Sequence, residues 1–455
     1  MTRVRILLVV LGCWLSVLSG QWLETTIHLP DSSEPLPMCY NSVNNKVCVG
    51  DNRRSRVFVI DGATNAIVAT VPTDSETSTL CYNPVSNKVY AASYYRNNVT
   101  IIDGVTDSVR ATIAQKTWSY VHALCCITER NEVFCPSRDS IMVIDGATDS
   151  IIDRFGFGGF PEAMCYNPAN GKVYAGCRSY GAPFLAVIDA ATRQVLNTVN
   201  VPGTPAAICV DPVNDKAYCA NYEWPASFQR STLSIIDGAG DSLLATIEFP
   251  DWSQPVAVCC NPENNRVYCA NWWSSKVAVI DGVSNQWTAT VSTSGPNALL
   301  YNAANNKIYC TSYSAVSVIV GWSSQIIITI PVGDDPRALA WNPVQNRVYV
   351  ANHASSSISV LRDSMTGVAE PMPSDPTREV RIPTIVRGVL RIGSQLAADG
   401  SRPGIELLDA SGRRVVMLSP GENDVSRLAP GVYFIRRPGS GGRGREEVRK
   451  VVIQR

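Results

Sequence analysis

The chain has 455 residues, of which 45% are hydrophobic and 17% are charged, and its 39 basic side chains balance 39 acidic ones. This hydrophobic content excludes a wholly disordered chain. The zero net charge argues against nucleic acid as a main partner, because binding to phosphates needs a positive surface. The length predicts at least two domains unless a repeat array takes up most of the chain.

The first 20 residues predict a signal peptide. Arg3 and Arg5 precede an apolar run over residues 6–18, and the small residues Ser19 and Gly20 follow it. A run of this length is typical of a secretory signal and too short to span a bilayer as a helix. We therefore expect an exported protein, secreted or attached to the cell surface, with no transmembrane segment.

Internal repeats occupy the segment 21–362. One phrase reads Tyr82-Asn-Pro-Val-Ser-Asn-Lys-Val-Tyr90, and we call its first residue the anchor. Related copies, spaced by 40–50 residues, have their anchors at Tyr40, Cys126, Tyr166, Val210, Cys260, Tyr301 and Trp341. The copy at Cys126 lacks the Asn-Pro pair and is the most degenerate. About 17 residues after most anchors, a second phrase of apolar residues ends in Ile-Asp-Gly, as at Val57–Gly62.

Each repeat is expected to contain four short strands, A to D. Strand A leads into the Asn-Pro turn, strand B begins at Lys-Val-Tyr, and strand C ends at the Asp-Gly turn. Strand D is an Ala-Thr-Val or Ala-Thr-Ile segment such as Ala69–Val71. Four strands in 40–45 residues are the signature of a β-propeller blade. We predict an all-β fold with an eight-bladed propeller, or seven blades if one copy is not a true blade.

The N-terminal strand is expected to close the ring. The eighth repeat contains strands A, B and C but lacks strand D, and an unmatched strand D over Thr25–Pro30 precedes the first repeat. Pairing the two would complete the eighth blade and remove an exposed sheet edge.

These phrases resemble the YVTN family of β-propeller repeats, and Val348-Tyr-Val-Ala-Asn352 fits that pattern most closely. The resemblance covers about three quarters of the chain. It implies a WD40-like repeat protein found outside the cytoplasm or at the cell surface. It implies no single catalytic site.

The composition changes after a Pro-rich linker at 363–378. Residues 379–455 are Arg-rich, and the segment from Arg378 onward has a net charge of +7, against −9 for residues 22–377. Glycine and proline turns separate short alternating runs, which predict a small Ig-like β-sandwich. These runs are Gly388–Ile392, Ile405–Asp409, Arg414–Leu418, Gly431–Arg436 and Val448–Ile453.

This C-terminal segment resembles the sorting domain of type IX secretion cargo. Three blocks match in the expected order, at Leu407–Arg413, Leu428–Phe434 and Arg449–Ile453. The resemblance implies that secretion machinery is a partner, although the Arg-rich composition departs from the best-known form. An ordinary Ig-like module bound to the propeller is the alternative.

The sequence offers little for catalysis. It contains only three histidines, His28, His122 and His353, with no spacing typical of a shared metal site. No Gly-x-Ser-x-Gly, phosphate loop or His-Glu-x-x-His is present. We therefore predict a non-catalytic protein with no cofactor and no metal. A propeller lyase, lactonase or dehydrogenase and a passive surface-layer or adhesion scaffold are the alternatives.

The recurring aspartate of Ile-Asp-Gly has two interpretations. Its copies are Asp61, Asp103, Asp145, Asp189, Asp237 and Asp281. They could form a set of calcium ligands. The favoured interpretation is a turn residue whose side chain bonds its own backbone.

The cysteines recur at matching positions in the repeats. One set directly precedes the anchor: Cys39, Cys81, Cys125, Cys165, Cys209 and Cys259. A second set follows the anchor by nine residues: Cys135, Cys219, Cys269 and Cys310. A hairpin centred on the Asn-Pro turn would place the two sets opposite each other, so that Cys125–Cys135, Cys209–Cys219 and Cys259–Cys269 are cross-strand neighbours. Disulfides there would be strained, and buried thiols between the blades are the favoured interpretation.

The B–C and D–A connections vary between repeats and should emerge on one face of the propeller. They are rich in aromatic and charged residues, which suit recognition of a protein or a carbohydrate ligand. The alternative role for many of these side chains is to plug gaps between blades. The candidate binding residues are Tyr94, Tyr95, Arg96, Trp118, Tyr120, Arg178, Tyr180, Tyr222, Trp224, Trp252, Trp272, Trp273, Tyr313 and His353.

Overall fold

The computed structural model describes residues 20–363 except 31, 94–97, 115–120, 122, 157, 180 and 223–230. It also describes the C-terminal segments 384–386, 389–392, 405–408, 414–418, 421–425, 428, 431–437 and 447–453. The chain divides into two compact units, Met1–Val368 and Ala369–Arg455.

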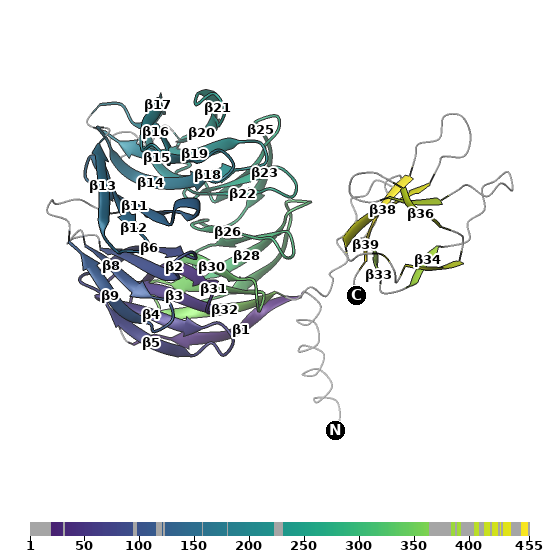
Figure 1. The fold of residues 1–455 in the computed structure, drawn as a ribbon, viewed down its shortest axis with the longest axis horizontal. Helices are drawn as coiled ribbons and strands as arrows, with labels where there is room; N and C mark the ends of the chain where they lie inside the picture. Colours follow the sequence, from purple (N-terminus) through teal and green to yellow (C-terminus); the bar gives the residue numbers. More distant parts are fainter. Residues whose placement is uncertain are drawn as a thin grey trace, which may run out of the picture. The chain divides into compact units, whose positions relative to one another are not determined.

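The first unit is a β-propeller of eight four-stranded antiparallel sheets, which confirms the predicted fold (Figure 1). The strands of blades 1 to 4 are β2 (Pro35–Asn41), β3 (Lys46–Asp51), β4 (Arg56–Asp61), β5 (Ile67–Pro72), β6 (Thr77–Asn83), β7 (Lys88–Ser93), β8 (Val99–Asp103), β9 (Ser108–Ile113), β10 (Cys125–Ile127), β11 (Glu132–Ser137), β12 (Ser140–Asp145), β13 (Ile151–Gly156), β14 (Phe160–Asn167), β15 (Lys172–Arg178), β16 (Phe184–Asp189) and β17 (Val195–Asn200). In blade 3, a short 3-10 helix (Thr128–Arg130) takes the place of the missing Asn-Pro turn.

The strands of blades 5 to 8 are β18 (Thr204–Asp211), β19 (Lys216–Tyr222), β20 (Ser231–Asp237), β21 (Leu243–Phe249), β22 (Pro255–Asn261), β23 (Arg266–Asn271), β24 (Lys276–Asp281), β25 (Gln286–Ser292), β26 (Leu299–Asn302), β27 (Lys307–Thr311), β28 (Ala315–Val320), β29 (Ile326–Pro331), β30 (Pro336–Asn342), β31 (Arg347–Asn352) and β32 (Ser357–Asp363). Blade 8 is completed by β1 (Gln21–His28), which pairs antiparallel with β32. This pairing confirms the predicted closure by the N-terminal strand. The Gln21 side-chain amide donates a 2.8 Å hydrogen bond to the Asp363 carboxylate across the junction.

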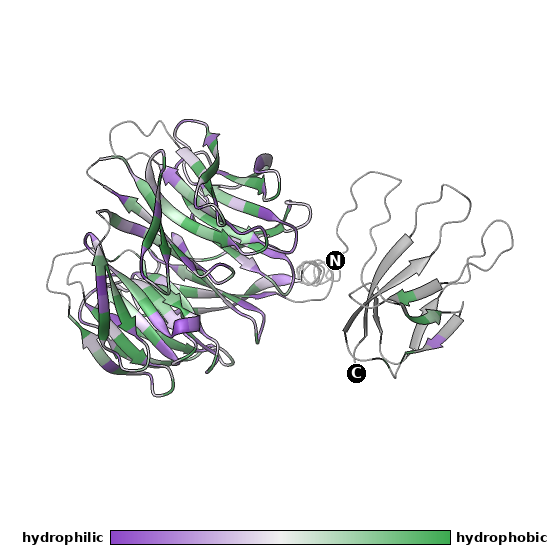
Figure 2. Cartoon of the chain, turned by 45° about the horizontal axis from the view of Figure 1, so that its top comes forward, coloured by the Kyte–Doolittle hydropathy of each residue, from purple (hydrophilic) through white to green (hydrophobic). Residues whose placement is uncertain are grey.

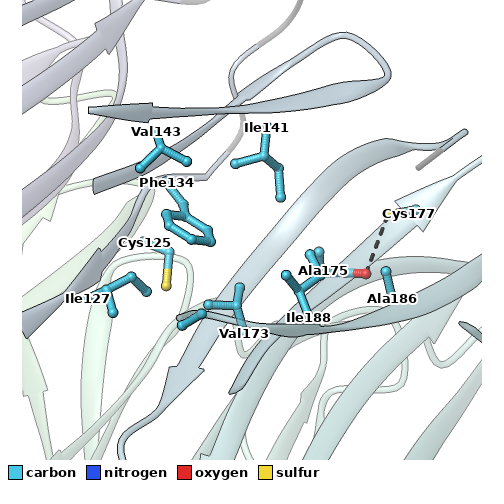
Figure 3. Close-up of a cluster of buried hydrophobic side chains, with 11 residues drawn as sticks. Cys125, Ile127, Phe134, Ile141, Val143, Val173, Ala175, Cys177, Ala186 and Ile188 are labelled. Carbon is cyan, nitrogen blue, oxygen red and sulfur yellow. Dashed lines mark hydrogen bonds between the residues drawn. The ribbon is translucent and has the colours of Figure 1, made fainter. Parts of the chain in front are cut away.

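The core lies between the blades, because strands B and C bury both of their faces against neighbouring sheets. In Figure 2 the hydrophobic residues concentrate in the strands of the propeller. Between blades 3 and 4, for example, Phe134 and Val143 meet Val173 and Ile188 in one buried cluster (Figure 3). The third residue of strand B is a fully buried tyrosine in six blades: Tyr90, Tyr174, Tyr218, Tyr268, Tyr309 and Tyr349.

The Ile-Asp-Gly aspartate is a turn residue, as the favoured interpretation held. The Asp61 carboxylate accepts hydrogen bonds from the backbone N–H groups of Ala63 (3.1 Å) and Thr64 (2.8 Å). The Thr64 hydroxyl also donates to this carboxylate (2.8 Å), and this bond, followed by the backbone bonds, holds the pKa of Asp61 below its usual value. The glycine that follows is required by close packing, since a Cβ at Gly62 would lie 2.5 Å from the side-chain oxygen of Asn45.

Adjacent blades are joined at the ends of their strands by a repeated polar contact. The first residue of strand B reaches the C–D turn of the next blade: the Lys46 ammonium group donates to the Gly104 carbonyl (3.2 Å) and pairs with Asp107 (2.7 Å). The same type of ion pair joins Lys88 to Asp149 (2.6 Å). Between blades 3 and 4 the charges are exchanged, and Glu132 pairs with Arg193 (3.0 Å).

The two cysteine sets are not opposite each other, and the predicted cross-strand pairs are wrong. The residue paired with Cys125 is Phe134, and Cys209 pairs with Tyr218. The A–B turn has four residues between its paired ends, so the residue before the anchor pairs with the eighth residue after it. This one-residue offset turns the two sets to opposite faces of the blade. Cys209 packs against blade 6, whereas Cys219 packs against blade 4.

The C-terminal unit is built from strands. A five-stranded sheet has the order β33 (Thr384–Val386), β39 (Glu447–Ile453), β38 (Gly431–Arg437), β35 (Ile405–Leu408) and β36 (Arg414–Leu418). A second sheet pairs β34 (Val389–Ile392) with β37 (Gly421–Asp424). All five predicted runs coincide with strands, and β33 and β37 were not predicted.

Candidate binding site

The D–A and B–C connections lie at one end of the propeller, because strands alternate in direction along each blade. We call this the loop end, and the end with the A–B and C–D turns the turn end. Seven of the predicted binding residues belong to the loop end within the described part of the chain: Arg178, Tyr222, Trp252, Trp272, Trp273, Tyr313 and His353. The other seven lie outside the described residues: Tyr94, Tyr95, Arg96, Trp118, Tyr120, Tyr180 and Trp224.

A cavity of about 480 Å³ lies at the loop end between two connections, and we call it the tryptophan cavity. Its lining residues are Asp251 and Trp252 from the β21–β22 connection, and Trp273 and Ser274 from the β23–β24 turn. Its volume falls in the range of about 300–1,000 Å³ that is usual for small-ligand sites. Trp252 is 57% exposed and Trp273 is 60% exposed, so both indole rings are accessible to a ligand.

Trp252 occupies an unusual backbone position. Its φ is 64°, in the left-handed region that a bulky side chain rarely adopts. The turn is held by Ser253, whose backbone N–H and hydroxyl both donate to the Pro250 carbonyl, at 3.2 Å and 2.5 Å. Residues held in such conformations concentrate at functional sites.

The turn before blade 1 shows that this conformation does not require tryptophan. There Ser32 has the same φ of 64°, and Ser33 makes the same two bonds to Pro30, at 3.2 Å and 2.7 Å. The same turn conformation is therefore compatible with serine at the position of Trp252. The large apolar ring contributes to the surface and is not needed to form the turn.

Trp273 is placed by the short β23–β24 turn. The Trp272 backbone N–H donates to the Gln254 carbonyl at 3.0 Å and so ties this turn to the loop that carries Trp252. The rings of Trp272 and Trp273 lie 4.9 Å apart at an interplanar angle of 59°. Trp272 is half-buried and is not among the cavity-lining residues, so its ring supports that of Trp273.

The remaining predicted residues are not brought into this cavity. Arg178 forms a 3.0 Å ion pair with Glu162. Tyr222 ends strand β19, and burial raises the pKa of its hydroxyl. Tyr313 is 63% exposed on blade 7, where its ring lies over Gly295.

His353 lies where blade 8 meets blade 1. Its Nε2 atom is 3.6 Å from the Glu34 carboxylate, and its Nδ1 atom is 3.5 Å from that of Asp335. Burial, followed by the positive charge of Arg337, lowers the pKa of His353 below its usual value. These contacts give His353 a role in joining the two blades.

Asp251 and Ser274 are the lining residues that sequence reasoning missed. Each directly adjoins a predicted tryptophan, and that adjacency was the available signal. Asp251 is exposed, and its carboxylate can accept hydrogen bonds, while the Ser274 hydroxyl can both donate and accept them. The cavity thus combines two apolar aromatic faces with a small number of polar groups.

Within the described residues, no three or more His, Cys, Asp or Glu side chains are grouped to hold a metal ion. In the same part of the chain, we find no helix with the length and apolar character needed to cross a membrane.

No protein-family model and no curated protein matches the sequence. Solved structures do resemble the fold. The Dos1 propeller superposes with a TM-score of 0.63 at 12% identity, over 76% of this chain and 96% of that one. A chain of hydrazine synthase from Kuenenia stuttgartiensis gives 0.51 at 14% identity, over 63% and 95%. Identities this low establish architecture alone, and the chain is an eight-bladed β-propeller with a separate C-terminal unit.

Proposed function

We propose that this protein is an exported β-propeller that binds carbohydrate at the tryptophan cavity. The observation that carries the proposal is the pair of exposed rings, Trp252 and Trp273, on two hydrogen-bonded loops beside the Asp251 carboxylate.

The chemistry of the cavity matches that of a sugar ring. A pyranose has an apolar face of C–H groups that packs on an aromatic ring, and hydroxyls around its edge. The rings of Trp252 and Trp273 supply apolar surface for the C–H face. Asp251 accepts hydrogen bonds from hydroxyls, and the Ser274 hydroxyl offers a second polar contact.

The size of the cavity favours a small ligand over a protein. A stable protein interface buries about 800 Å² on each partner, formed by roughly 20–30 residues. Among the described residues, four line the tryptophan cavity, which has a volume of about 480 Å³. A protein ligand would therefore need extensive further contacts around the cavity.

The wider setting of the protein is part of the same proposal. The repeat phrases support membership of the YVTN family, and the leader-like start supports export to the cell surface or the medium. The three C-terminal blocks support a sorting domain that engages type IX secretion machinery. The function is non-catalytic binding, with no cofactor.

A glycan array tests the proposal. The chain from residue 21 to 455 is applied to the array, and the variants Trp273→Ala and Trp322→Ala are compared with it. Trp322 is the matched control because it is 51% exposed but lies in the β28–β29 turn, at the turn end. We expect saturable glycan binding that Trp273→Ala weakens by about tenfold or more and Trp322→Ala leaves unchanged. Binding to peptides alone, or equal effects of both variants, would contradict the proposal.

A further inference from the structure

Two thiols from different blades lie in direct contact at the wall of the propeller's inner strands. The Sγ atoms of Cys209, on β18 of blade 5, and Cys260, on β22 of blade 6, are 2.8 Å apart and share a hydrogen bond. Both side chains are only partly buried. Because strands β18 and β22 are the A strands of adjacent blades, a bond between these atoms would join the blades directly.

A second pair occupies the equivalent positions in blades 2 and 3. Cys81 directly precedes the anchor of blade 2, and Cys126 is the anchor of blade 3. The interaction between their thiols raises the pKa of Cys81 and lowers that of Cys126, and both residues are partly buried. The relation is the same as for Cys209 and the anchor Cys260.

The repeat geometry explains why these pairs meet. The residue before the anchor of one blade packs beside the anchor of the next, as Cys39 does with Tyr82 and Cys125 does with Tyr166. Cysteine is the anchor only in blades 3 and 6. The same packing therefore brings two sulfur atoms together at these two junctions, independently of the A–B hairpin register.

We propose that Cys81–Cys126 and Cys209–Cys260 are redox-active dithiol pairs that form inter-blade disulfides by exchange with a disulfide donor. The thiolate of one cysteine attacks the donor disulfide, and one donor sulfur leaves as a thiol. The second cysteine then attacks the resulting mixed disulfide and releases the other donor sulfur. Each pair loses two electrons and two protons, and the donor is reduced to two thiols.

The environment of the thiols indicates which atoms react first. The hydrogen bond from Cys81 lowers the pKa of Cys126, which favours its thiolate as the attacking group. Burial raises the pKa of Cys269 and Cys310, and both are fully inaccessible to solvent. Thiols in such surroundings are slow to exchange. The contact with Cys126, followed by burial, also raises the pKa of Cys81, and burial raises that of Cys209, so the choice of these pairs rests on the contact between the paired thiols.

Oxidised glutathione is the probe for the first experiment. The full chain from residue 21 is reduced, freed of reductant while folded, and incubated with this probe, and its disulfides are mapped by peptide mass spectrometry. We expect Cys81–Cys126 and Cys209–Cys260 linkages and an increase in Tm on the order of 5 °C that reduction reverses. If these four cysteines remain alkylatable thiols, form stable mixed disulfides with glutathione, or link to other cysteines, the proposal is overturned.

Serine variants test the pairing without depending on one substitution. Cys260→Ser is expected to abolish only the 209–260 linkage, and Cys126→Ser only the 81–126 linkage. Cys219→Ser is the matched control, because Cys219 lies in the same blade as Cys209 but faces blade 4. It should leave both linkages intact. If a variant fails to fold, the mapping of the unsubstituted chain still decides the question.

Discussion

The two ends of the propeller differ in how far their side-chain contacts repeat from blade to blade. At the turn end, nearly every blade repeats the same contacts: an aspartate caps its own turn, and the first residue of strand B bonds the next blade. At the loop end, the backbone bonds recur but the side chains differ. The repeated contacts of the turn end therefore hold the blades in the propeller ring. At the loop end, the side chains of one blade can differ from those of the others and form a binding site.

Blades 1 and 6 share a backbone bond at the loop end but carry different side chains there. The Asn52 N–H donates to the Glu34 carbonyl at 2.8 Å, just as the Trp272 N–H donates to that of Gln254 at 3.0 Å. On this common frame, blade 1 carries an Arg53–Glu34 ion pair of 3.0 Å. Blade 6 carries the two tryptophans instead. Backbone bonds hold the loops in both cases, and Trp252 and Trp273 are 57% and 60% exposed.

The largest predicted effect comes from the exchanged charges at the turn end. Glu132 is 4% exposed and pairs with Arg193, so Glu132→Lys would bury two like charges. We expect a loss of about 3 kcal/mol in the free energy of unfolding, measured by urea denaturation. The double variant Glu132→Lys/Arg193→Asp introduces the Lys–Asp pair that joins blades 1 and 2 and blades 2 and 3, and it should recover much of this loss. A single variant as stable as the parent would contradict the charge-exchange account.

The next effect concerns close packing in the C–D turn. In Gly62→Ala, the added Cβ would lie 2.5 Å from both the Asn45 oxygen and the Asn342 amide nitrogen. We expect a destabilisation of about 1–3 kcal/mol, because two blades must shift to make room. Gly156→Ala is the control, since its nearest neighbour would be at 3.4 Å. Equal urea midpoints for the two variants would show that the turn end is less tightly specified than the structure indicates.

The smallest effect is a pH dependence at the loop end. Because burial lowers the pKa of His353, this imidazole binds a proton more readily in the unfolded chain than in the folded chain. The free energy of unfolding is therefore unaffected by protonation of His353 well above pH 6.5, the approximate pKa of histidine in the unfolded chain. It decreases as the pH falls through and below that value. We expect His353→Asn to flatten the stability profile between pH 7 and pH 5 by less than about 1 kcal/mol. An unchanged slope would contradict the role given to burial.

The sequence was sufficient to predict the ring but not the contacts within it. The spacing of the anchors and the unmatched strand before Tyr40 predicted eight blades and their closure, because both follow from a one-dimensional repeat. The predicted cross-strand cysteine pairs were wrong by one residue in register. In a strand, a shift of one residue moves a side chain to the opposite face of the sheet. The ion pair of Glu132 with Arg193 spans 61 residues and becomes visible only when adjacent blades are placed together.

For the binding site, sequence reasoning identified the aromatic residues but could not select among them. Trp252 and Trp273 are 21 positions apart and meet only because two loops share a backbone bond. Trp272, equally prominent in sequence, is half-buried and supports its neighbour. To choose between Trp272 and Trp273, one must know in which direction the turn orients each ring, and the sequence does not show this.

The most direct test of the account replaces the blade 6 pair with the residues that blade 1 uses. Trp252→Ser/Trp273→Arg keeps the turn conformation that Ser32 already adopts. We expect Tm to change by no more than about 2 °C, while affinity for the glycan selected on the array falls by about tenfold or more. Unchanged affinity, or a loss of several degrees in Tm, would contradict a binding role for these tryptophans.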